Sequence, residues 1–167
     1  MEMLSSYFKV RPIVEEDLIQ VLELYQGNLF FFRHCPPEPS LASIQEDIRR
    51  LPDGKSQSDK YYLGFWEKEK LVAVMDFVYD YPNEETVFIG FFMVNSSCQG
   101  MGIGSRIIQE TFVYFSRSFR KVRLAYVKTN PQAKHFWEKQ GFLPTGIEVK
   151  EELYTFVIAE RELSQGE

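Results

Sequence analysis

Residues 91–110, FFMVNSSCQGMGIGSRIIQE, constrain the fold more than any other stretch of this chain. An apolar run typical of a strand leads through small polar residues into alternating glycines, and an apolar helical pattern follows. Glycines at such a junction leave the first amides of the helix uncovered by side chains. Uncovered amides and the helix dipole together favour an anion such as a pyrophosphate. The other interpretation is a plain strand-to-helix turn that needs glycine only for its backbone angles.

Two common nucleotide-binding motifs do not fit these glycines. A P-loop requires a lysine and then a serine or threonine after its last glycine, whereas Gly104 is followed by Ser105 and Arg106. A dinucleotide fingerprint requires G-x-G-x-x-G. Counting from Gly100 places Ser105 at the third glycine, counting from Gly102 places an isoleucine there, and no acidic residue follows at the required distance. Both motifs are therefore excluded.

The hydrophobic periodicity of the rest of the chain predicts a mixed α/β sheet with helices on both faces. Ser40 is a candidate N-cap, Asn130 and Pro131 are typical of a helix start, and Gly141 suits a left-handed helix end. We expect an irregular aromatic loop at 30–39 and one domain over residues 1–167. The expected strands are 7–13, 61–67, 70–79, 86–94, 121–129, 142–150 and 153–162, and the expected helices are 15–28, 39–54, one after the glycines, and 130–141.

Composition limits the classes of function. A net charge of −5 and a pI near 5.2 argue against nucleic acid as a partner, because such proteins usually carry a basic stripe. The first ten residues do not resemble a signal peptide, and the most apolar stretch, 88–94, is too short to span a membrane. We therefore expect a cytoplasmic protein without membrane contact. Cys35 and Cys98, like His34 and His135, are too far apart in sequence to indicate a metal site or a disulfide.

The pattern Q-x-x-G-x-G over residues 99–104 resembles the acyl-CoA pyrophosphate loop of the GNAT N-acetyltransferase superfamily. Upstream, FFMVNSS resembles the end of the family's fourth strand. Downstream, NPQAKHFWEKQGF resembles its N-x-x-A-x-x-hydrophobic-Y-x-x-x-G-F helix. The predicted order of elements over residues 7–162 also matches that fold.

This resemblance implies a GNAT-like fold, in which a mostly antiparallel sheet contains a parallel, splayed pair formed by the fourth and fifth strands. It implies acetyl-CoA as co-substrate and no metal. The pantetheine arm would pair with backbone at Met93 and Val94. The pyrophosphate would lie on main-chain amides of a loop, and three further residues would line the far wall. The loop residues are Gln99, Gly100, Met101, Gly102, Ile103, Gly104 and Ser105, and the wall residues are Asn130, Ala133 and Phe136. A helix cap also explains Asn130, and core packing also explains Phe136.

Acetyl transfer to an amine requires a neutral amine, so a base or a water chain has to remove a proton. The family often places a glutamate where this chain has Phe88, and a tyrosine acid where it has Trp137. Asp76 is the leading replacement for the base, because a carboxylate within the apolar run LVAVMDFVY is expected to be hydrogen-bonded or functional. Its other interpretation is an ordinary ion-paired or solvent-facing aspartate. Other candidates are Tyr79, Glu84, Glu85, His34, His135 and Tyr126.

The resemblance therefore implies an N-acetyltransferase in which a primary amine attacks acetyl-CoA directly in a ternary complex. The acceptor, a small-molecule or peptide amine, would enter from the side of the first two helices. The alternative is a non-catalytic acyl-CoA-binding module, supported by the loss of both usual proton carriers. Either a monomer or a homodimer is compatible with the sequence.

Overall fold

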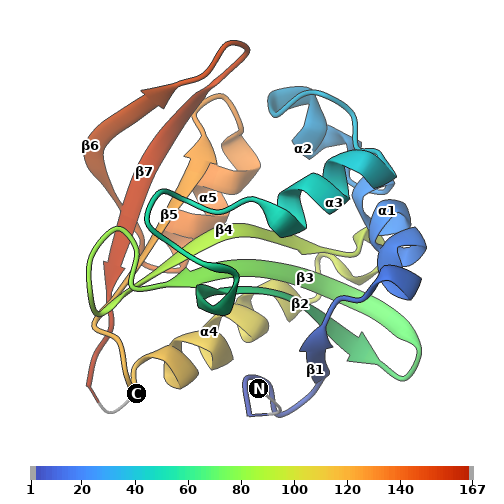
Figure 1. The fold of residues 1–167 in the computed structure, drawn as a ribbon, viewed down its shortest axis with the longest axis horizontal. Helices are drawn as coiled ribbons and strands as arrows, with labels where there is room; N and C mark the ends of the chain where they lie inside the picture. The colour runs from blue at the N-terminus through green and yellow to red at the C-terminus, as the bar shows by residue number, and fades with distance from the viewer. Residues whose placement is uncertain (1–2, 166–167) are drawn as a thin grey trace.

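The computed structural model describes residues 3–165, which form one seven-stranded mixed sheet with helices on both faces (Figure 1). The strand order is β1-β2-β3-β4-β5-β7-β6, and every neighbouring pair except β4 and β5 is antiparallel. The strands are β1 (Lys9–Pro12), β2 (Lys60–Glu67), β3 (Lys70–Tyr79), β4 (Thr86–Val94), β5 (Lys121–Val127), β6 (Leu143–Lys150) and β7 (Thr155–Glu162). The helices are α1 (Leu18–Gln26), α2 (Leu29–His34), α3 (Leu41–Arg49), α4 (Ile103–Phe115) and α5 (Pro131–Lys139).

Each face of the sheet has its own hydrophobic core. Alternate side chains of β3 divide between the two, because successive residues of a strand point to opposite faces. Met75 and Phe77 pack with α4 and α5, whereas Val74 packs with α1 and α3. The half-buried aromatic side chains of α2 join the second core. The sheet is thus covered by α4 and α5 on one side and by α1 to α3 on the other.

The parallel pair β4 and β5 separates partway along its length. Pairing joins residues 86–89 of β4 to residues 121–124 of β5 and then stops. β4 nevertheless continues to Val94 and β5 to Val127, and Figure 1 shows β5 turning away from β4. Beyond Ile89 the two strands therefore present facing backbone edges that do not bond to each other. The splay expected from the resemblance is confirmed.

Most predicted elements are confirmed, including the Ser40 N-cap, the Asn130 N-cap followed by Pro131, and the positive φ of Gly141. The prediction of an irregular loop at 30–39 is wrong over its first part, because residues 30–34 belong to α2. Six residues are too few to show helical periodicity. Contacts with Tyr25 and Phe91 hold the aromatic side chains of α2 in place instead. Within residues 3–165, no helix is long and apolar enough to cross a membrane.

Candidate functional site

The glycine loop begins where β4 ends, at the open end of the splay. Gly100 and Gly102 have φ of 79° and 75°, the left-handed region that favours glycine, and a Cβ atom at either would meet nothing within 4 Å. Gly102 is the N-cap of α4, and no side chain caps this helix end. The first amides of α4 thus remain available to a ligand, as the sequence pattern predicts.

Gly104 serves a different purpose, which is close packing. A Cβ atom here would lie 3.3 Å from Cγ2 of Val94 and 3.4 Å from Cε2 of Phe136. Phe136 in turn stacks on Phe92 with ring centroids 6.0 Å apart. The structure therefore brings together the end of β4, the first turn of α4 and the inner face of α5, which the sequence assigns to one cofactor channel.

The side chain of Gln99 anchors the loop. Its Nε2 donates to Oδ1 of Asn28 at 2.6 Å and to the carbonyl oxygen of Val94 at 2.9 Å. Nδ2 of Asn28 donates to the same carbonyl at 3.2 Å. The Val94 carbonyl is thereby satisfied, and the main-chain amide of Gln99 donates to the carbonyl oxygen of Ser96 at 3.4 Å. Gln99 therefore holds the loop in place, and the amides open to a ligand are those at the start of α4.

The remaining predicted cofactor residues lie in different surroundings. The buried Asn130 caps α5 by accepting a hydrogen bond from the amide of Ala133 at 3.1 Å, as the helix-cap interpretation predicts. The hydroxyl of Ser105 accepts from Nε2 of Gln140 at 2.9 Å, which ties α4 to α5. Met93 is buried on the α1 side of the sheet. Of the two remaining loop residues, Met101 is exposed and Ile103 is partly buried.

Asp76 lies on β3, directly opposite Phe91 of β4. The register shifts after this pair, so Gly90 is an extra residue that forms a bulge in β4. Gly90 is exposed, and a Cβ atom here would lie 3.4 Å from Oδ2 of Asp76. The bulge follows Ile89, the last residue paired with β5. The Asp76 carboxylate therefore faces the point at which the splay opens.

The surroundings of Asp76 perturb its acidity. The residue is buried, and burial raises the pKa of its carboxyl group to about 6, although the ammonium of Lys60, 3.1 Å from Oδ2, acts in the opposite direction. The hydroxyls of Tyr25 and Tyr62 are hydrogen-bonded to each other nearby, and burial raises the pKa of both phenols. Near neutral pH both phenols are protonated, and Asp76 is the group that titrates.

Three other candidates for the base lie near the end of the sheet at which β4 and β5 are paired. Tyr79 is the last residue of β3 and pairs with Val87, and Glu84 and Glu85 belong to the turn before β4. The carboxylate of Glu85 forms an exposed ion pair with Arg120. These residues are at the opposite end of β4 from the glycine loop, so the topology separates them from the splay.

The histidines and Tyr126 occupy different positions. Nδ1 of His34 is 2.9 Å from Oγ1 of Thr129, so α2 reaches across to the end of β5. His135 is exposed on α5. Tyr126 is buried on β5 beyond the stretch paired with β4, and burial raises the pKa of its phenol, which keeps the group protonated. Of the three, Tyr126 lies on a strand of the splay and carries a proton.

The two positions at which the family often has proton carriers are occupied by packed rings. Phe88 contacts the ring of Tyr81, with centroids 5.5 Å apart. Trp137 is buried against Phe136 and Phe142. Both side chains therefore serve the packing of the fold.

Lys60 and Gly90 were missed by the sequence reasoning. The pattern starts the second strand at Tyr61, one residue too late. Counting back from the tight turn between β2 and β3 would place Tyr61 opposite Asp76 and Lys60 on the other face. A register shift between Phe65 and Trp66 instead brings Tyr62 opposite Asp76 and puts Lys60 on the same face. Neither this shift nor the bulge at Gly90 had a signal in the sequence, since both depend on the register between two strands.

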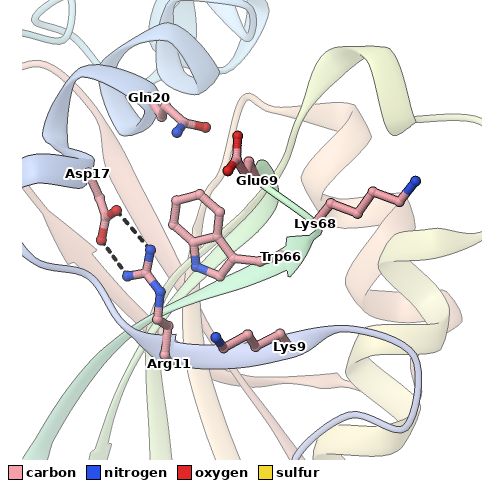
Figure 2. A pocket seen from close by; sticks show the side chains of 7 residues that line it. All are labelled: Lys9, Arg11, Asp17, Gln20, Trp66, Lys68 and Glu69. Atoms are coloured by element: carbon pink, nitrogen blue, oxygen red, sulfur yellow. Dashed lines mark hydrogen bonds and ion pairs between the residues drawn. The ribbon is translucent and has the colours of Figure 1, made fainter.

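A pocket of about 310 Å³ lies elsewhere, at the β1 edge of the sheet (Figure 2). Arg11 and Asp17 form an ion pair with two hydrogen bonds on one side of it, and the guanidinium lies 4.2 Å above the ring of Trp66. The pocket is lined by Lys9, Arg11, Asp17, Gln20, Trp66, Lys68 and Glu69. It is separate from the splay, and its central charges neutralise each other. Within residues 3–165, no three potential metal ligands cluster.

Comparison with known proteins identifies the family. The model of the "Acetyltransferase (GNAT) family" matches residues 19–142. An acetyltransferase from Thermus thermophilus is similar in structure, with a TM-score of 0.72 and 20% identity over 92% of this chain and 96% of that one. Spermidine N-acetyltransferase from Vibrio cholerae, in complex with CoA and spermine, has a TM-score of 0.70 and 18% identity over 96% and 98%.

A third similar structure is the ribosomal-protein-S18-alanine N-acetyltransferase from Escherichia coli, with a TM-score of 0.65 and 12% identity over 93% of each chain. Among curated proteins, none is significantly similar to this chain in sequence. At these identities the solved structures establish the fold, and the family match covers most of the chain.

Proposed function

Because this chain belongs to the GNAT acetyltransferase family, we propose that it transfers the acetyl group of acetyl-CoA to a primary amine. The observation that carries this proposal is the position of Asp76. Its carboxylate faces the Gly90 bulge, where the splay opens, and its pKa of about 6 suits a base at neutral pH.

The chain offers acetyl-CoA a fitting site. The unpaired edges of β4 and β5 beyond Ile89 suit the amides of the pantetheine arm, which would bond there as an added strand does. The uncapped start of α4 and the glycines of residues 99–105 suit the pyrophosphate. Val94, Gly104 and Phe136 would confine the arm between them. When bound, acetyl-CoA supplies an acetyl group activated as a thioester.

Asp76 acts on the acceptor. An alkylammonium has a pKa near 10.4, so the amine loses a proton before or as it attacks. The carboxylate of Asp76 accepts that proton, the new bond forms between the amine nitrogen and the acetyl carbon, and the bond from that carbon to sulfur breaks. A backbone amide near Val94 would stabilise the carbonyl oxygen as charge develops on it.

The sulfur leaves as a thiolate. A thiol with a pKa near 8.5 is a fair leaving group without assistance. Transfer can therefore proceed with Trp137 in place of the usual tyrosine. The protonated phenol of Tyr126, on the other strand of the splay, is a candidate substitute.

The acceptor would approach from the side of α1 and α2, on the same face as Asp76. The half-buried rings of Phe31 and Phe91 contact each other there, backed by the buried Tyr25, and offer aromatic surface to an ammonium or an apolar group. The similar structures are named for a polyamine and for a protein alanine as acceptors, so both classes belong in the first assay.

Thiol release from acetyl-CoA tests the proposal. Purified protein would be assayed with polyamines, aminoglycosides, amino acids and peptide amines, with acetyl-CoA binding measured by calorimetry in the same preparation. We expect release with one class of amine. Tight binding without release with any amine would favour the alternative, an acyl-CoA-binding module that has lost the chemistry, for which Phe88 and Trp137 are the supporting observations.

A further inference from the structure

Lys60 is a buried cation whose donors are fully used. Its side chain is only 5% exposed. The ammonium lies 3.1 Å from Oδ2 of Asp76 and donates to the carbonyl oxygens of Asp47 and Arg50, each at 2.6 Å. An ammonium has three donors, and three oxygen atoms surround this one. Such complete pairing is what a buried charge requires.

The two carbonyl groups belong to the last turn and the C-cap of α3. This is the negative end of the helix, where a cation is favoured. Lys60 therefore joins the end of α3 to the Asp76 carboxylate, which faces the splay. Residues 47–50 and Asp76 are far apart in sequence, and the ammonium contacts both.

The other groups around Asp76 do not replace this cation. The carboxylate of Asp47 on α3 is negative and raises the pKa of Asp76. The phenols of Tyr25 on α1 and Tyr62 on β2 are neutral, because burial raises the pKa of both. From β4, the residue opposite Asp76 is Phe91, which is apolar. Lys60 is the cation that acts on Asp76 from these elements.

We propose that Lys60 is a positioning residue for catalysis, which fixes the Asp76 carboxylate toward Gly90 and keeps it ionised so that it accepts the acceptor's proton. This rests on the proposed role of Asp76 as the base. Without the ammonium, burial and the Asp47 carboxylate would act on Asp76 unopposed. Its proton would then be held at neutral pH, and the carboxyl group would no longer act as a base.

The direct test is an NMR titration of the Asp76 carboxyl carbon in protein labelled with ¹³C-aspartate, with Asp76→Asn used to assign the signal. Lys60→Met removes the charge and all donors. Lys60→Gln removes the charge but keeps an amide donor, so it carries the same test if Lys60→Met does not fold. Lys60→Arg is the conservative control, because it keeps the charge. Circular dichroism and acetyl-CoA binding would verify the fold of each variant.

We expect the titration midpoint of the Asp76 carboxyl group to rise by about one pH unit or more in Lys60→Met and Lys60→Gln. In Lys60→Arg it should stay within about half a pH unit of the wild-type value. With the acceptor found in the amine panel, the neutral variants would lose about tenfold in rate at pH 6 and recover most of it near pH 9. An unchanged Asp76 midpoint, or a loss of rate equal at every pH, would overturn the proposal.

The same measurements separate this proposal from the one on which it rests. If Asp76→Asn retains the acidic limb of the pH–rate profile, Asp76 is not the base, whatever Lys60 does to its pKa. If Asp76→Asn loses that limb while Lys60→Met leaves it in place, only the role of Lys60 is wrong.

Discussion

Asp17 and Asp76 each lie beside a cation, yet their pKa values shift in opposite directions. Asp17 accepts two hydrogen bonds from the Arg11 guanidinium, at 2.6 and 2.9 Å, and one from the amide of Val14. These bonds, those from Arg11 foremost, hold the pKa of Asp17 below its usual value. Asp76 has Lys60 at 3.1 Å, yet burial raises its pKa to about 6.

The difference lies in how well each carboxylate is satisfied. Asp17 accepts hydrogen bonds from the planar guanidinium of Arg11 and from a backbone amide, so these bonds stabilise its charge more than burial destabilises it. Asp76 has a single cation that it shares with two carbonyl groups, and its other side faces the Gly90 bulge. A carboxylate that its ion pair leaves incompletely hydrogen-bonded, next to an opening, indicates a catalytic role. A carboxylate whose hydrogen bonds are complete indicates a structural role.

The largest expected effect is on turnover. Asp76→Asn removes the proton acceptor, so kcat should fall by about 10²- to 10⁴-fold, while the affinity for acetyl-CoA stays within about twofold. Asp17→Asn is the matched control, since it makes the same change in the other ion pair and should keep kcat within about threefold at 25 °C. Steady-state kinetics and calorimetry on both variants check this. Equal losses in both would remove the distinction between the two pairs.

For the free energy of unfolding we expect the reverse, with Asp17→Asn having the larger effect of the two variants. Asp17→Asn leaves Arg11 without its charged partner, and we expect a loss of about 1–3 kcal/mol in the free energy of unfolding. Urea denaturation at pH 7 measures this. Because the folded-state pKa of Asp17 is lowered, its contribution is complete above the unfolded value near 3.9 and is lost as pH falls through the folded value. The difference between wild type and Asp17→Asn should therefore shrink toward pH 2.

The contribution of Asp76 to stability should depend on pH in the opposite direction. Its raised pKa means that the folded protein binds this proton more tightly than the unfolded chain does, so the stability it contributes is complete below about pH 3.9 and is lost as pH rises through about 6. Asp76→Asn should abolish this fall between pH 4 and 6. Urea midpoints measured across that range check the sign, and a fall that persists in the variant would assign it to another group.

The smallest expected effect comes from two glycines. Gly90→Ala puts a methyl group about 3.4 Å from the Asp76 carboxylate and should lower kcat/KM for the acceptor about tenfold, with the acetyl-CoA Kd unchanged. Gly104→Ala crowds Val94 and Phe136 and should instead raise the Kd for acetyl-CoA about tenfold. Kinetics and calorimetry on the two variants separate the acceptor side of the splay from the cofactor side. Identical behaviour of the two would contradict that division.

Much of the fold could be predicted because its signals are local. Alternating apolar residues define most strands, and Ser40, Asn130 and Gly141 mark helix ends through preferences of their own backbone and side chains. α2 could not be predicted, since it depends on aromatic contacts with residues that are distant in sequence.

The candidate site also has parts that could be predicted from the sequence and parts that could not. The glycine loop is a continuous motif, so its position can be predicted from residues 99–105 alone. The left-handed conformation of Gly100 and Gly102 is known only from the structure. The sequence singles out Asp76 because it interrupts an apolar strand. The Gly90 bulge that its carboxylate faces and the cation that restrains it come from pairings across three strands, which no single segment encodes.

The most direct test of the account is the pH dependence of kcat for wild type and Asp76→Asn, with whichever amine supports thiol release from acetyl-CoA. We predict that the wild-type rate rises with pH through a midpoint near 6, because the base works only when ionised, and that the residual rate of the variant lacks this step. A wild-type midpoint near 6 that reappears unchanged in Asp76→Asn would contradict the assignment of Asp76 as the base.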